Sequence, residues 1–194
     1  MSDTLTAKAE PALKVIYDAA AVSGAISKLA AQVIDRYKGR DALFVSLLNG
    51  GPVFSTMLMM EADRQDPDFC PEVCYLNIET YGDGQTAREP KLTQPLSSGT
   101  RVKGRVAVVL DEVLDSGVTT AKAEEYLRSL GAEDVELVVL VRKERQRKAW
   151  QEATLYALAA PDVWLNGLGM DGSPGRPPEV FRFADYISVV EPGE

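Results

Sequence analysis

VAVVLDEVLDSGVTT, which spans Val106–Thr120, joins a nearly continuous apolar run to three acidic residues and then to a segment of small residues. A run that is apolar at successive positions is typical of a parallel strand covered on both faces, and the small residues after it are typical of a turn into a helix. Clustered carboxylates repel one another, so the fold alone does not explain Asp111, Glu112 and Asp115 at the end of this run. We infer that a ligand uses them.

Strand-like and helix-like segments alternate on both sides of this stretch. The first helix-like segment follows Asp18, a typical N-cap residue, and stops at Gly39, while a later one is closed by Gly131. The alternation predicts a single α/β domain with a mainly parallel sheet flanked by helices. The predicted strands are residues 42–48, 72–81, 105–111, 134–143, 154–160, 162–170 and 186–190, and the predicted helices are residues 19–39, 53–65 and 119–132.

Two segments lack such periodicity. Residues 1–14 mix small, charged and Pro residues and are expected to form a flexible N-terminal arm, which leaves residues 15–194 for the domain. Residues 82–104 are polar and rich in Gly and Pro. A structureless loop of that length in a compact domain is usually functional or mobile, so we expect a functional loop here.

The composition limits the kinds of catalysis, binding partner and cellular location that this chain can have. The chain has no histidine, which removes His-based catalytic triads and leaves acid/base work to carboxylates, Lys or Tyr. The net charge of −8 argues against a nucleic-acid surface and suits Mg²⁺ as a partner, although the basic run RKERQRK stands out locally. No apolar run of about 18 residues and no apolar leader is present, so a cytoplasmic protein without a membrane span is expected. Cys70 and Cys74 are expected to be reduced thiols.

Ligands of open α/β sheets bind beyond the carboxyl ends of the strands. Two unusual turns, NGGP at residues 49–52 and DEVLDSGVTT at residues 111–120, follow predicted strands at such ends. The N–H groups and hydroxyls of residues 116–120 at a helix start would form a cradle for a phosphate, with the acids binding sugar hydroxyls or Mg²⁺ beside it. The alternative is that Ser116 and Thr119 only cap the helix and that the acids are solvated.

The full string resembles the signature of the type I phosphoribosyltransferase family, which binds 5-phosphoribosyl diphosphate (PRPP). The matching order is apolar strand, two acids, two apolar residues, Asp, small hydroxyl residue, Gly, any residue and Thr. The Asp in the fifth place, Asp115, resembles the 6-oxopurine, or hypoxanthine-guanine, branch of the family, because the adenine enzymes typically carry Ala there. The resemblance implies a type I fold with a small base-binding hood formed by residues 154–194, approximately.

Other segments resemble the family in the same order along the chain. LLNGG is similar to the pyrophosphate loop, which assigns Leu48, Asn49 and Gly50 to substrate binding and a cis peptide to Leu48–Asn49. ETYGDGQT resembles the mobile catalytic loop, with Thr80 and Tyr81 in place of the usual Ser-Tyr pair.

The base-binding side follows from three later segments. LVRK resembles the base-recognition strand and indicates Lys143 rather than its neighbour Arg142. The segment DVWLNGLGMD is similar to the family segment that stacks on the purine and closes with an Asp near Mg²⁺. The segment FRFADYI is similar to a family segment with an Arg that contacts pyrophosphate. The insertion SPGRPPEV leaves Arg176 as an alternative for that Arg. These segments assign Trp164, Leu165, Asp171 and Arg182.

The chain departs from the family pattern at three places. The acidic pair reads Asp111-Glu112, which leaves open which carboxylate meets which ribose hydroxyl. Asn49 replaces a common Lys, and Val118 occupies a frequently polar place. Taken singly, a Trp such as Trp164 is more often a core residue, and a Lys in a basic run such as Lys143 is more often solvated; their order and spacing favour the resemblance.

The resemblance implies transfer of 5-phosphoribosyl from PRPP to N9 of hypoxanthine or guanine, giving IMP or GMP and pyrophosphate in purine salvage. In that reaction Asp115 would accept the purine N7 proton, and the loop around Thr80 and Tyr81 would close as a lid. Two alternatives remain: a regulator that senses PRPP or a nucleotide without turnover, and an enzyme that acts on xanthine or a pyrimidine. The family also implies a homodimer or homotetramer. By the same resemblance Asp111, Glu112 and Asp171 would lie at Mg²⁺, and Ser116, Gly117, Val118, Thr119 and Thr120 would bind the 5′-phosphate.

Overall fold

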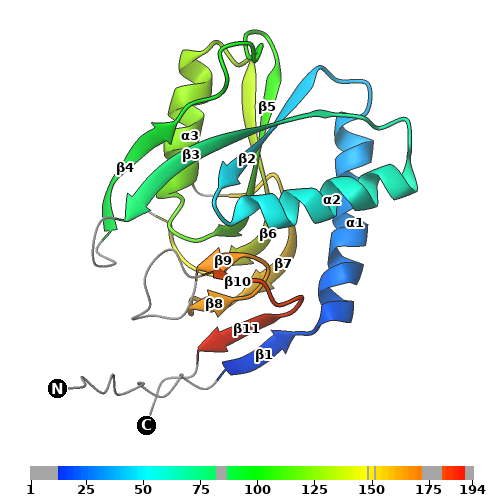
Figure 1. The fold of residues 1–194 in the computed structure, drawn as a ribbon, viewed down its shortest axis with the longest axis vertical. Coiled ribbons are helices and arrows are strands. Elements are labelled where there is room, and N and C mark those ends of the chain that lie inside the picture. Colours follow the sequence, from blue (N-terminus) through cyan, green and yellow to red (C-terminus); the bar gives the residue numbers. More distant parts are fainter. Residues whose placement is uncertain (1–12, 82–86, 148, 151, 172–180, 191–194) are drawn as a thin grey trace, which may run out of the picture.

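A six-stranded sheet in the order β4-β3-β2-β5-β6-β7 forms the centre of the molecule (Figure 1). Neighbouring strands from β3 to β7 run parallel, and β4 runs antiparallel to β3. The predicted mainly parallel sheet is therefore confirmed. Its strands are β2 (Ala42–Leu48), β3 (Glu72–Tyr81), β4 (Ala87–Gln94), β5 (Val106–Leu114), β6 (Asp134–Lys143) and β7 (Leu155–Ala160).

The described part of this computed structural model is residues 13–81, 87–147, 149–150, 152–171 and 181–190, with the backbone alone described at residues 80, 81, 87, 88, 171, 181, 182 and 190. Arg176 lies outside it. Within it, no helix is long and apolar enough to cross a membrane. Cys70 and Cys74 are free thiols, as expected.

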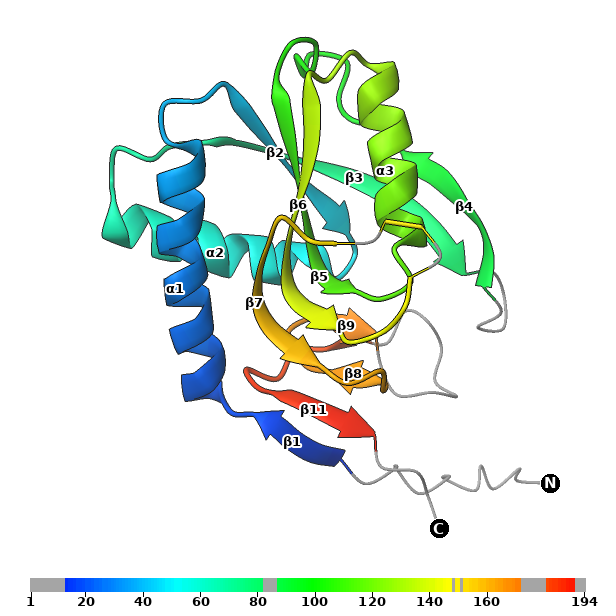
Figure 2. The ribbon, with the colours of Figure 1, turned by 180° about the vertical axis from the view of Figure 1, so that it is seen from behind.

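Helices cover both faces of the sheet, with α1 (Ala19–Tyr37) and α2 (Gly51–Gln65) on one face and α3 (Val118–Ser129) on the other (Figures 1 and 2). Asp18 caps α1 as predicted, because its Oδ1 accepts a hydrogen bond of 2.8 Å from the N–H of Ala21. All three predicted helices are present.

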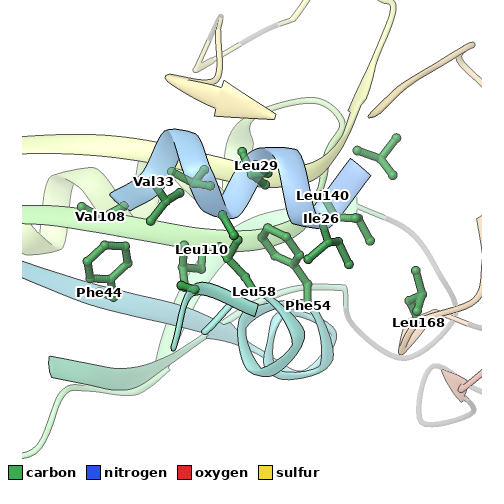
Figure 3. Packing of buried hydrophobic residues seen from close by; sticks show 14 of the residues in the cluster. Ile26, Leu29, Val33, Phe44, Phe54, Leu58, Val108, Leu110, Leu140 and Leu168 are labelled. Carbon is green, nitrogen blue, oxygen red and sulfur yellow. The ribbon is translucent and has the colours of Figure 1, made fainter. Parts of the chain in front are cut away.

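The larger core cluster lies between α1, α2 and the sheet, where Figure 3 shows the side chains interlocking. Phe44 of β2, Phe54 of α2 and Val33 of α1 are each 0% exposed. Burial of one such side chain stabilises the fold by roughly 1.5–3 kcal/mol. A second cluster fills the space between the sheet and α3.

A buried carboxylate ties α1 to the centre of the sheet. Glu136 of β6 accepts hydrogen bonds from Arg36 Nε at 2.6 Å and from the Tyr37 hydroxyl at 2.8 Å. Burial acts to raise the pKa of Glu136, but the hydrogen bonds and the charge of Arg36 outweigh it and hold the pKa below its ordinary value.

Strand β5 is longer than predicted. The sequence ends it at Asp111, whereas its pairing with β6 continues as far as Leu114 opposite Arg142. Glu112, like Asp111, therefore lies within the strand and not after it. The two acids only interrupt the apolar run, which resumes with Val113 and Leu114, and backbone pairing with β6 continues through them.

The prediction of one loop over residues 82–104 is wrong for its central part, because β4 (Ala87–Gln94) pairs there with β3. Pro90 lacks a backbone N–H but is compatible with this strand. Strand β4 lies at the edge of the sheet, and Pro90 falls where the register with β3 shifts. Residues 82–86 lie outside the described residues.

A small hood lies beside the main sheet and pairs the first described strand, β1, with the last, β11 (Figure 1). Its first strand includes Leu13 and Lys14, which the sequence assigned to the N-terminal arm. The sequence assigned β7 to the hood, but β7 belongs to the main sheet. The hood sheet has the order β1-β11-β8, and β9 pairs with β10. Its strands are β1 (Leu13–Tyr17), β8 (Leu165–Asn166), β9 (Met170–Asp171), β10 (Phe181–Arg182) and β11 (Ile187–Val190).

Two polar residues face each other inside the hood. Asn166 of β8 is opposite Ser188 of β11, and both are 0% exposed. Neither the amide of Asn166 nor the hydroxyl of Ser188 has a hydrogen-bond partner among the described residues. Such buried polar groups cost stability.

Candidate active site

The carboxyl ends of β2, β5 and β6 meet at one edge of the sheet, because these strands are parallel neighbours. This edge brings together the turn Asn49–Gly51, the acids of β5 and Lys143 at the end of β6. The segments that the sequence selected for separate reasons therefore share one location.

The turn after β2 is shaped by close contacts. Its Leu48–Asn49 peptide is cis, as expected from the resemblance. A Cβ added at Gly50 would lie 2.1 Å from Oε1 of Glu112, and one added at Gly51 would lie 3.2 Å from the carbonyl oxygen of Leu110. Only a glycine at position 50 lets the Glu112 carboxylate reach this turn.

The hood packs on the same turn. Gly169 has a φ of +84°, and a Cβ added there would lie 2.7 Å from the side chain of Val53 and 3.4 Å from the carbonyl oxygen of Gly50. The segment between β8 and β9 thus covers the start of α2 and the turn that precedes it.

The start of α3 has the geometry of an anion site. Gly117 is the N-cap residue with a φ of +75°, and Val118 is the first helical residue. The N–H groups of the first turn have no carbonyl partner within a helix, and the helix dipole favours a negative charge beside them. The hydroxyl of Thr120 donates to the carbonyl oxygen of Gly117 at 3.0 Å, so only the backbone of Thr120 remains for a ligand.

The backbone of Trp150 closes the other side of this loop. A Cβ added at Gly117 would lie 2.4 Å from the carbonyl oxygen of Trp150 and 2.8 Å from its nitrogen. The Trp150 N–H also donates to the Gly117 carbonyl oxygen at 3.4 Å. Gly117 is therefore required both by its φ and by its neighbour.

Asp115 faces the end of β6. Its Oδ2 accepts a hydrogen bond from Lys143 Nζ at 2.6 Å, while the neighbouring Arg142 points elsewhere and donates to Glu152 at 2.9 Å. The side chain of Lys143 is 9% exposed and that of Asp115 is 41% exposed. Of the two residues weighed from the sequence, Lys143 is the one beside Asp115.

Sequence reasoning missed the residues that follow Lys143. Arg145 donates to the other oxygen of Asp115 at 2.5 Å and lies 3.1 Å from Asp162. Arg147 donates to the carbonyl oxygen of Lys143 at 2.5 Å and so fixes the turn after β6. The dense charges of RKERQRK are the signal that could have found them.

The remaining predicted residues are only partly placed. Trp164 is partly buried directly before β8, and Leu165 is 5% exposed. The backbones of Asp171 and Arg182 lie in the paired strands β9 and β10. Thr80 and Tyr81 lie at the end of β3. The side chains of Asp171, Arg182, Thr80 and Tyr81 lie outside the described residues, so their roles stay predictions.

Known proteins resemble this chain at modest sequence identity over most of its length. The hypoxanthine-guanine phosphoribosyltransferase of Bacillus subtilis is 26% identical over 180 residues, covering 92% of this chain and 93% of that protein. The bifunctional protein TilS/HprT of Listeria monocytogenes is 27% identical over 168 residues, but the match spans only 24% of its length.

Solved structures agree in fold. A hypoxanthine phosphoribosyltransferase from Staphylococcus aureus has a TM-score of 0.78 at 23% identity and covers 92% of this chain and 91% of that one. A hypoxanthine-guanine phosphoribosyltransferase from Bacillus anthracis has a TM-score of 0.76 at 19% identity. The family model of the phosphoribosyl transferase domain matches residues 13–171, from the first hood strand to the end of β9. This chain therefore belongs to the phosphoribosyl transferase domain family.

Proposed function

We propose that the chain transfers the 5-phosphoribosyl group of PRPP to N9 of a 6-oxopurine, hypoxanthine or guanine, giving IMP or GMP and pyrophosphate. The observation that carries this proposal is the contact of Asp115 with Lys143, 2.6 Å between Oδ2 and Nζ, beside the anion site at the start of α3. An acceptor and a donor side by side match the N7–H and the 6-oxo group of such a purine.

The phosphoribosyl side of the substrate would bind along the carboxyl ends of β2 and β5. The N–H groups from Gly117 to Thr120 hold the 5′-phosphate, and Asp111 and Glu112 hold the ribose hydroxyls. The turn at Asn49 and Gly50 receives the pyrophosphate. Departure of pyrophosphate leaves positive charge on the ribose, which nearby carboxylates stabilise.

On the base side, Asp115 accepts the N7 proton, since the chain has no histidine to act as the base. Lys143 donates to the 6-oxo group, and Trp164 stacks on the ring. Adenine presents a 6-amino donor where Lys143 also donates, so one hydrogen bond is lost. The loop that follows Thr80 and Tyr81 closes over the site and keeps water away.

The acidic residues fit Mg²⁺. Among the described residues no group of three or more potential ligands is gathered, and Mg²⁺ is usually held by one or two carboxylates together with substrate phosphates and water. Asp111 and Glu112, with Asp171 as a third candidate, would hold it. When bound, Mg²⁺ offsets the negative charge of the pyrophosphate.

The test is release of pyrophosphate from PRPP in the presence of Mg²⁺ and hypoxanthine, guanine, xanthine, adenine or a pyrimidine base. We expect kcat/KM for hypoxanthine to exceed that for adenine by roughly thirty- to a thousandfold, because a lost buried hydrogen bond costs about 2–4 kcal/mol. Lys143→Ala should remove this preference. Arg142→Ala is the matched control, since Arg142 pairs with Glu152 and not with Asp115.

The same experiment separates the alternatives. If Arg142→Ala rather than Lys143→Ala removed the preference, the assignment of Lys143 would be wrong. Binding of PRPP without release of pyrophosphate for any base would indicate a regulator.

Sedimentation of the purified chain tests the homodimer or homotetramer that we propose from the family.

A further inference from the structure

Asp115 lies between two cations that come from the same end of β6. Lys143 Nζ donates to Asp115 Oδ2 at 2.6 Å, and Arg145 Nη1 donates to Oδ1 at 2.5 Å. The same nitrogen of Arg145 lies 3.1 Å from Oδ1 of Asp162, in the segment that follows β7. One guanidinium therefore bridges two carboxylates.

These contacts limit what Asp115 can do in the proposed reaction, on which this inference rests. A carboxylate that takes the N7 proton needs an oxygen that faces the purine. Both oxygens of Asp115 already accept a hydrogen bond from a cation, so an incoming N7–H competes with these cations for the lone pairs of the carboxylate.

Arg145 is the cation better able to move. The side chain of Arg145 is 31% exposed, whereas that of Lys143 is 9% exposed. Arg145 also has Asp162 within reach, and the side chain of Asp162 is 46% exposed. A small shift toward Asp162 would therefore keep the guanidinium in an ion pair while it released Asp115.

We propose that Arg145 is a positioning residue shared by Asp115 and Asp162, and that it withdraws to Asp162 when the purine takes its place on Asp115. Arg145 then competes with the base for Asp115, and Asp162 weakens that competition. Loss of Arg145 and loss of Asp162 shift the affinity for the base in opposite directions. A role confined to stabilising the loop would shift it in one direction.

The experiment compares the KM for hypoxanthine in Arg145→Ala, Asp162→Asn and the double variant. We expect the KM to fall about threefold in Arg145→Ala and to rise about threefold in Asp162→Asn, the size typical of partly exposed ion pairs. The double variant should match Arg145→Ala, because Asp162 acts only through Arg145. The KM for PRPP should stay unchanged in all three.

Arg142→Ala is the matched control, because it removes a cation of the same segment that pairs with Glu152. Its KM for hypoxanthine should equal that of the wild type, and thermal unfolding of each variant reveals any loss of fold. Shifts of the same sign in Arg145→Ala and Asp162→Asn would overturn this inference alone. A wild-type chain that releases no pyrophosphate with any base would overturn the proposed function and the inference together.

Discussion

Replacement of Gly117 by Ala should damage the turn at the start of α3 more than the same replacement damages the turn at another left-handed glycine. Gly117 has a φ of +75° and Gly104 has a φ of +74°, so both variants lose the conformational freedom of glycine. That loss costs about 1–2 kcal/mol. A Cβ at position 117 would also lie 2.4 Å from the carbonyl oxygen of Trp150, whereas one at position 104 would have no atom within 4 Å.

The contact with Trp150 involves backbone on both sides, so a side-chain rotation cannot relieve it. Such overpacking costs about 1–3 kcal/mol more. Since about 1 kcal/mol corresponds to about 2–4 °C in a chain of this size, Gly117→Ala should melt several degrees below Gly104→Ala. Its KM for PRPP should also rise, because a shifted loop no longer directs its N–H groups at one point.

Thermal unfolding and steady-state kinetics on the two variants measure these effects separately. Gly104→Ala should keep the wild-type KM for PRPP, because Gly104 is exposed and lies outside the site. Equal melting temperatures in the two variants, together with an unchanged KM for PRPP in Gly117→Ala, would refute the reasoning.

Three further predictions concern single buried or catalytic groups. Glu136→Gln should lower the free energy of unfolding at pH 7 by about 1.5–3 kcal/mol. The folded pKa of Glu136 is lowered, so the stability that its carboxylate contributes is present above the unfolded pKa of about 4.3 and is lost as the pH falls through the folded pKa. The free energy of unfolding of the variant, measured by chemical denaturation, should therefore depend less on pH below about 4.3 than that of the wild type. Asp115→Asn should keep the KM for PRPP but lower kcat about a hundredfold or more in the pyrophosphate assay, and a near-normal kcat would remove Asp115 from the mechanism. Asn166→Leu should raise the melting temperature, because it removes an amide without a partner among the described residues; a lower value would contradict this expectation.

The elements with strong periodicity could be predicted from the sequence. Strands β3 and β6 match their predicted bounds, and α1 begins after its predicted cap, Asp18. These features depend on local patterns of apolar residues and on capping, which the sequence carries directly. Strand β4 could not be predicted, because its residues have little apolar alternation and form a strand only by pairing with β3.

The candidate site shows the same division. The glycines and acids around Asp115 belong to one local signature, and Lys143 is indicated by the resemblance of LVRK to the base-recognition strand of the family. The charged run RKERQRK draws attention to Arg145 but not to its partners, and Asp162 could not be identified, since their contact forms only when two segments at the ends of neighbouring strands meet. The hood strand β1 is likewise explained only by its partner β11 near the other end of the chain.

The pairing of β1 with β11 also determines the order in which parts of the molecule can form during synthesis. The six strands of the main sheet leave the ribosome before β11, so that sheet can collapse early, whereas β1 waits for the last described residues. Meanwhile Tyr17 at the end of β1 can already donate to the carbonyl oxygen of Ala159 in β7 at 2.6 Å, which would keep β1 near its final place. A chain truncated before Ile187 and released from the ribosome would therefore have its central sheet and an unfinished hood, with the edge of β1 exposed to other chains.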